Sequence, residues 1–317
     1  MPSASPPRWS HDLLPGRTAP PRAAPSYRGP AVDWLTHPFS FEFMQRALAA
    51  GVLAALTTSV VGTWVILRGL AFMGDALAHG VLPGIALAVL LGFNPVAGAA
   101  VAAVVMVGAI SLVHRATRLS EDTAIGLLFV GMLALGVILI SRRGSFAIDL
   151  MAILFGDVLG TTRGDLLLQG VAAALALGGV ALFYRPLLVL CFNEQKAAAL
   201  GLRPRLAHLV MMGLITLAVV SSFQAVGALL VFGLLIAPPA TAVLLARRVP
   251  TVMVVAAALG ISEVVIGLLL SYHFDTAAGA TMSGLAVAVF FLVLAGERGW
   301  AAVAGRRAQA TAEDTLG

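Results

Sequence analysis

The sequence predicts an all-α fold: a polytopic membrane bundle of eight to nine transmembrane helices with broken or re-entrant segments. Hydrophobic residues make up 60% of the 317 positions and charged residues only 11%, whereas ordinary soluble chains carry about 25% charged residues. The mean hydropathy is +0.98. The apolar stretches are rich in Leu, Ala, Val and Gly and lack the alternation of barrel strands, which indicates helices.

The two ends of the chain differ in composition from its middle. Residues 1–42 hold nine of the sixteen prolines and no long apolar run, so we expect a disordered Pro- and Arg-rich tail. No apolar stretch follows Met1 directly, so we expect no ordinary cleavable signal peptide. A transmembrane domain over 43–296 follows, and 297–317 form a polar C-terminal tail.

The middle of the chain divides into apolar segments of membrane-spanning length, about 17–25 residues each. Residues 146–160 are apolar but too short and too acidic to span, which indicates a re-entrant or interfacial piece. The predicted spanning segments are 43–67, 76–92, 95–114, 123–140, 165–184, 206–223, 226–247, 250–271 and 276–296.

The basic residues predict orientation in the membrane and not nucleic-acid binding, because they are spread between the apolar segments and the net charge is only +5. If nine segments span, most of the basic residues beside segment ends lie on one side, which is then cytoplasmic. That arrangement puts the Arg-bearing N-terminal tail outside, which the same rule disfavours. Eight spans with one re-entrant segment would remove the conflict.

Asp75 and His79 are the first candidate site residues. They lie four residues apart and so share one face of a helix, and carboxylate plus imidazole is a ligand pair for first-row metal ions. Gly80, Pro83 and Gly84 follow, so we expect an interrupted helix of the kind that exposes polar groups inside transporters. A purely structural Asp–His hydrogen bond is the alternative.

Glu263 is the second candidate, since it is the one charge in segment 250–271 and lies close to its middle. An acidic side chain there costs on the order of 3 kcal/mol and often marks a transport pathway. A hydrogen bond to a Ser or the backbone of a neighbouring helix is the alternative. His273, at the outer end of the same segment, could be an entry residue or a solvated loop residue.

Two further features concern movement and energy supply. Pro238 and Pro239 predict a kink or break near residue 236, because proline removes a backbone donor and clashes with the preceding turn. The polar loop 191–205 could hold a short helix that docks on another protein, or simply connect two spans. No G-x-x-x-x-G-K-[ST] phosphate loop occurs, so any ATPase would be a different polypeptide.

Six ordered blocks resemble the permease subunit of metal-type ABC importers, the zinc and manganese uptake family. They begin with GLAFMGDALAHGVLPGIALAVLLG (69–92) and LSEDTAIGLLFVGMLALGVILIS (119–141). The likeness to zinc-uptake members is closest through SYHFDTAAGAT (271–281). The other blocks are DLMAILFGDVLG (149–160), NEQKAAALGL (193–202), SSFQAVGALLVFGLLIAPPATAVLL (221–245) and the wider GLLLSYHFDTAAGAT (267–281).

The resemblance implies a fold of the ABC importer permease type in the cell membrane, acting as a homodimer. It implies two cytoplasmic ATP-binding subunits that hydrolyse the ATP, and an extracytoplasmic metal-binding protein that delivers the ion. Asp75 and His79 match the family's acidic and histidine positions. The residues on the ATPase-docking loop would be Asn193, Glu194, Ala197 and Gly201.

The functional hypothesis is import of a divalent transition metal by alternating access, zinc first and manganese second, with no cofactor bound by this chain and no catalytic residue. Asp75 and His79 hold the ion transiently, together with Glu263. A self-contained secondary metal transporter is the alternative, but it would leave the docking-like loop unexplained. An intramembrane enzyme is disfavoured because no nucleophile–base or metalloprotease spacing occurs.

Overall fold

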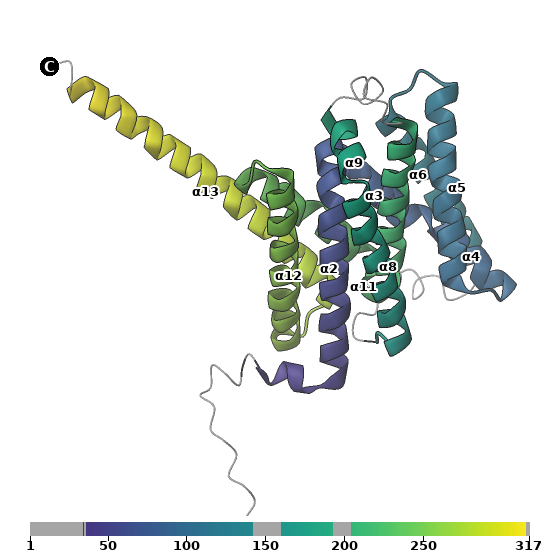
Figure 1. Cartoon of the computed structure of the whole chain (residues 1–317). Coiled ribbons are helices and arrows are strands. Elements are labelled where there is room, and N and C mark those ends of the chain that lie inside the picture. Colours follow the sequence, from purple (N-terminus) through teal and green to yellow (C-terminus); the bar gives the residue numbers. More distant parts are fainter. Residues whose placement is uncertain (1–33, 35, 142–159, 193–203, 315–317) are drawn as a thin grey trace, which may run out of the picture.

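The computed structural model describes residues 34, 36–141, 160–192 and 204–314, and within these ranges every regular element is a helix (Figure 1). Eight of the described helices are long and apolar enough to cross a membrane, which confirms the predicted polytopic bundle. The elements are η1 (Pro38–Ser40), α2 (Glu42–Arg68), α3 (Ala71–Gly80), α4 (Leu82–Leu91), α5 (Pro95–Ala116), α6 (Glu121–Ser141), α8 (Arg163–Leu182), α9 (Tyr184–Phe192), α11 (Pro204–Leu245), α12 (Val249–Phe274) and α13 (Ala278–Asp314).

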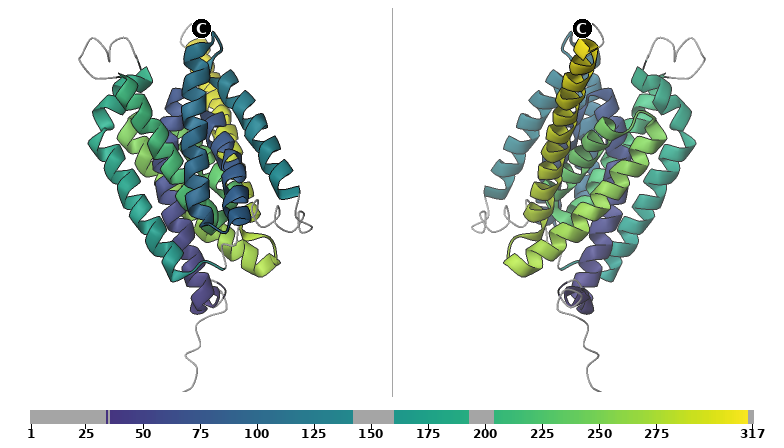
Figure 2. Two further views of the ribbon diagram at one scale, coloured as in Figure 1. Left: turned by 90° about the vertical axis from the view of Figure 1, so that its right-hand side faces the viewer. Right: turned by 90° about the vertical axis from the view of Figure 1, so that its left-hand side faces the viewer.

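Helix α2 lies at the centre of the bundle and packs against α11, α12 and α8 (Figures 1 and 2). One reason is its small residues, among which Ala47, Ala50 and Ala54 are fully buried. Without a hydrophobic force between helices in lipid, close approach of small residues is a main source of association. From α8, Gln169 Nε2 donates a hydrogen bond of 3.1 Å to the carbonyl of Ala50.

Three pairs of helices meet so closely that a glycine on one approaches the backbone of the other. A Cβ at Gly62 of α2 would lie 1.9 Å from the carbonyl oxygen of Leu235 on α11. A Cβ at Gly98 of α5 would lie 2.3 Å from the carbonyl oxygen of Gly84 on α4. The third contact joins α12 to α13, where a Cβ at Gly267 would lie 2.8 Å from the Cα of Met282.

The backbone of α11 leaves helical geometry at Gly227 (φ 79°, ψ 161°), so the break predicted near residue 236 is wrong. Pro238 and Pro239 lie inside the helical stretch that follows. They deprive the carbonyls of Leu234 and Leu235 of their helical donors. Helix α2 compensates, since its Ser59 Oγ donates to the Leu234 oxygen at 3.4 Å and Gly62 packs on the next carbonyl. The proline pair therefore lies at a helix contact.

The ends of the transmembrane domain differ in detail from the sequence expectation. Most of the expected N-terminal tail, 1–42, lies outside the described residues, but its end forms η1 and the start of α2. Helix α13 continues past residue 296 to Asp314, because the Ala-rich stretch from 301 onward favours helix. The expected re-entrant piece at 146–160 lies outside the described residues except for its last residue, and so does the part of loop 191–205 from 193 to 203.

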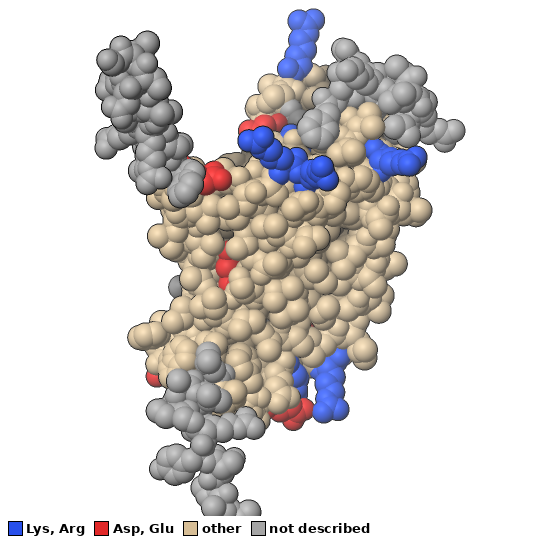
Figure 3. All heavy atoms as spheres, turned by 60° about the vertical axis from the view of Figure 1, so that its left-hand side comes forward, with Lys and Arg blue, Asp and Glu red and all other residues tan. Residues whose placement is uncertain are grey.

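Lys and Arg lie at the two ends of the visible surface, and the broad, largely apolar band between them shows a few acidic atoms but no Lys or Arg (Figure 3). At one end, Arg163 of α8 pairs with Glu42 of α2 at 3.0 Å. At the other, Arg68 Nη1 donates to the carbonyl of Leu190 at 2.8 Å. An apolar band of this kind between two charged ends is the arrangement expected of a protein that spans a bilayer.

Candidate functional site

The structure places Asp75 and His79 side by side on α3, with His79 Nε2 3.4 Å from Asp75 Oδ1. The side chain of His79 is 20% exposed and that of Asp75 is 27% exposed. Both side chains are therefore partly exposed although they belong to a candidate membrane-spanning segment. A carboxylate and an imidazole at this separation can accept one divalent metal ion between them.

Two glycines hold α3 in place on either side of this pair. A Cβ at Gly74 would lie 2.2 Å from Leu235 Cδ2 of α11, and one at Gly80 would lie 2.0 Å from Met106 Sδ of α5. A larger residue at either position would require Leu235 or Met106 to change its side-chain conformation. The glycines that the sequence places around the pair thus let α3 pack closely on α11 and α5.

The predicted interruption of this helix is present, since Val81 separates α3 from α4. Pro83 lies in the first turn of α4. Because proline has no N–H, the carbonyl oxygen of His79 lacks the donor that residue 83 would supply in a continuous helix. The N–H of Val81 partly replaces that donor, since it points at the carbonyl oxygens of His79 and Leu77.

Phe129 of α6 borders the pair, with its ring centroid 5.9 Å from that of His79. Phe72, two turns before His79 on α3, also meets Phe129, at 6.5 Å. Sequence reasoning missed Phe129 because an aromatic residue inside an apolar segment carries no signal of its own. These rings form an apolar border to the ligand pair.

Glu263 is buried in α12, at 1% exposure, and neither carboxylate oxygen has a hydrogen-bond partner among the described residues. The alternative reading, a hydrogen bond to a neighbouring helix, is therefore not seen in the described part of the chain. One turn earlier, Gly260 packs on α2, where its Cβ would lie 2.6 Å from Ser59 Oγ. Glu263 thus lies in the packed interior between α12 and α2.

The four predicted pathway residues do not form one cluster. Among the described residues, no group of three or more His, Cys, Asp or Glu side chains could hold a metal ion. His273 lies in the last turn of α12, where its Nδ1 donates a hydrogen bond of 2.9 Å to the carbonyl oxygen of Leu269, and its ring stacks on that of Trp34 with the centroids 4.2 Å apart. Asp75 and His79 are thus the one pair that the structure brings together.

The predicted docking residues Asn193, Glu194, Ala197 and Gly201 lie outside the described residues, so their placement stays a prediction.

An interrupted membrane helix that carries a carboxylate–imidazole pair inside a polytopic bundle is typical of membrane transport proteins. Residues 40–297 match the ABC 3 transport family. The manganese transport system membrane protein MntC of Listeria monocytogenes is 40% identical over 252 residues, which are 80% of this chain and 90% of that protein. The chelated iron transport system membrane protein YfeD of Yersinia pestis is 35% identical over 82% of this chain and 86% of its own length.

A solved structure agrees with these relatives. PsaBC from Streptococcus pneumoniae, solved in complex with Fab, matches with a TM-score of 0.75 and 33% identity over 83% of this chain and 95% of that one. The chain belongs to the ABC 3 transport family. It is a permease of the ABC type and a multi-pass protein of the plasma membrane, as its eight apolar helices require.

Proposed function

We propose that this permease imports a divalent transition-metal ion, with manganese as the first candidate, and that Asp75 and His79 hold the ion in transit. The names of similar proteins support metal transport, since they refer to manganese or chelated iron. Zinc, the first choice from the sequence, has no specific support from these relatives. It therefore enters the experiment below as a competitor.

The separation of Asp75 and His79 carries the proposal. Two ligand atoms at about 2.1 Å from one ion lie about 3.4 Å apart at a tetrahedral angle, and about 3.0 Å apart at the right angle of an octahedron. The observed distance between Nε2 and Oδ1 is 3.4 Å. An ion could enter with side-chain adjustments of a few tenths of an ångström, so this distance favours neither coordination geometry.

Two protein ligands leave most of the ion's coordination to other groups. The carbonyl oxygen of His79 is one further acceptor on the same helix, although the N–H of Val81 also points at it. Water is another, since both side chains are partly exposed. Incomplete coordination suits a transport site, because an ion that is bound too tightly does not leave.

Glu263 has a separate role in this proposal, as a buried acceptor that an ion meets at another stage of its passage. A buried carboxylate without a partner is costly, and a passing cation would offset that cost. His273 lies at the end of the same helix, beside Trp34, where an ion could arrive first.

The proposed assembly is a homodimer with two ATP-binding subunits and an external metal-binding protein. Asn193, Glu194, Ala197 and Gly201 would form the contact with the ATP-binding subunit. The alternative of a self-contained secondary transporter gains no support from the relatives, whose family is of the ABC type.

The test is uptake of radioactive manganese after co-expression with an ATP-binding subunit and a binding protein, with zinc and iron(II) as competitors. We expect Asp75→Asn and His79→Gln to lower uptake at least tenfold, since even outer partners of metal ligands contribute 10–100-fold. Asp275→Asn is the matched control, because Asp275 caps the end of α12. Uptake at the wild-type level in Asp75→Asn would exclude the proposed site, and stronger inhibition by zinc than by unlabelled manganese would restore zinc as the substrate.

A further inference from the structure

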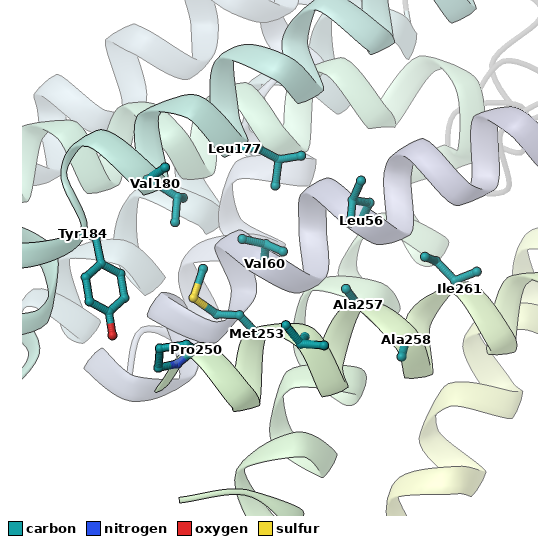
Figure 4. Close-up of a pocket in the computed structure, with 12 residues that line it drawn as sticks. Leu56, Val60, Leu177, Val180, Tyr184, Pro250, Met253, Ala257, Ala258 and Ile261 are labelled. Atoms are coloured by element: carbon teal, nitrogen blue, oxygen red, sulfur yellow. The ribbon is translucent and has the colours of Figure 1, made fainter. Parts of the chain in front are cut away.

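An apolar groove of about 800 Å³ runs along α2 between α8 and α12 (Figure 4). Leu56 and Val60 of α2 form its floor, and Leu177, Met253 and Ala257 line its walls. Apart from the hydroxyl of Tyr184, the labelled side chains in the groove are apolar. The groove is separate from Asp75 and His79, which are not among its lining residues.

One end of the groove adjoins basic residues. Tyr184 and Pro250 lie together at that end, and Ile261 lies at the opposite one (Figure 4). Arg185 follows Tyr184 directly, while Arg247 and Arg248 come just before Pro250, and all three arginines are exposed. No acidic side chain among the described residues forms an ion pair with these three.

The location of the groove in the membrane restricts what can fill it. Its walls belong to spanning helices, so its contents come from the hydrocarbon layer or from another protein surface. An acyl chain gains little by leaving the bilayer for an equally apolar groove. Selection must therefore come from the head group. Three exposed arginines at the mouth, which form no ion pair with another described residue, select a negative one.

We propose that this groove binds an anionic phospholipid, with one acyl chain along Leu56, Val60 and Ala257. Its phosphate lies between Arg185, Arg247 and Arg248, and the hydroxyl of Tyr184 lies at the level of the head group. Aromatic residues with a polar tip favour this level of the membrane. The lipid would contact both α8 and α12, each of which packs on α2.

The test is native mass spectrometry of the intact permease, extracted from nanodiscs of equal parts phosphatidylglycerol and phosphatidylcholine. We expect bound phosphatidylglycerol to exceed phosphatidylcholine. Each arginine near an anionic lipid contributes roughly a fivefold preference. Arg247→Gln with Arg248→Gln should therefore lower the preference about 30-fold, and Arg185→Lys should keep most of it.

Two further variants separate a lipid site from its alternatives. Arg118→Gln, in the connection between α5 and α6, removes an exposed arginine that does not adjoin the groove and should change nothing. Ala258→Trp fills the groove, whose wall includes Ala258, and should displace the lipid, whereas Val105→Trp, on exposed α5 surface, should not. Equal retention of the two lipids, or an unchanged preference in the double variant, would overturn the proposal. If Ala258→Trp weakened dimerisation and left lipid binding intact, the groove would be an interface between two copies.

Discussion

Replacing Gly62 by alanine tests how much the fold depends on the backbone contact between α2 and α11. The added methyl carbon would lie 1.9 Å from the carbonyl oxygen of Leu235, 2.9 Å from its carbonyl carbon and 3.1 Å from Pro239 Cγ. An ordinary contact between carbon and oxygen is about 3.3 Å. The two helices would have to separate by about 1.4 Å, and the nearest obstacle is backbone, which no side-chain rotation can move.

The expected loss of unfolding free energy combines three contributions. Overpacking costs typically 1–3 kcal/mol, and we expect the upper value, about 3 kcal/mol, because backbone meets backbone. Separation of the helices would also break the hydrogen bond of 3.4 Å from Ser59 to Leu234, which contributes about 1 kcal/mol. Alanine favours helix over glycine by about 1 kcal/mol. The net loss is therefore about 3 kcal/mol.

The assay is reversible unfolding of the purified permease in mixed micelles with increasing SDS, followed by circular dichroism. Gly178→Ala on α8 is the matched control, because a Cβ there would meet nothing within 4 Å. That variant should be as stable as the wild type or slightly more stable. If Gly62→Ala unfolded within 0.5 kcal/mol of this control, the close contact would be unimportant and the reasoning refuted.

Two more variants test other parts of the bundle. Gly98→Ala would bring a methyl group within 2.3 Å of the Gly84 carbonyl oxygen, so we expect the free energy of unfolding to fall by about 2 kcal/mol. Gly108→Ala on the same helix is the control, because the space there is open. Thermal unfolding should give Gly98→Ala the lower melting temperature, and equal melting temperatures would contradict the prediction. Glu263→Gln keeps the shape of a side chain that has no hydrogen-bond partner among the described residues. The stability of the fold should therefore not fall, while manganese uptake should drop. Unchanged uptake would show that no ion meets Glu263.

Hydropathy predicted the membrane-spanning helices closely, because burial in lipid leaves few alternatives to helix. The interruption before α4 was predictable too, since Gly80 and Pro83 act locally. The break in α11 was not. Pro238 and Pro239 gave the stronger local signal, but Ser59 and the backbone around Gly62 come from a distant part of the sequence and stabilise helix at the prolines.

The candidate site was predictable only where its residues are neighbours in sequence. The spacing of Asp75 and His79 on one helix determines that they meet. Whether Glu263 or His273 joins them depends on how α3 and α12 pack, and local spacing carries no information about that. The sequence also failed to predict that α13 continues to Asp314. The polar residues after 296 end the membrane-spanning segment, but they do not end the helix.

The close glycine contacts also bear on which parts of the protein can move. Contacts between backbones cannot adjust by a change of rotamer, so the closest approaches of α2 with α11, α4 with α5, and α12 with α13 are the least adjustable ones. At two of its glycines α3 meets α11 and α5 through side chains, Leu235 against Gly74 and Met106 against Gly80, and side chains can change rotamer. Asp75 and His79 therefore lie on a helix whose contacts at these glycines can adjust, and under the proposed function this would let the pair shift against its neighbours.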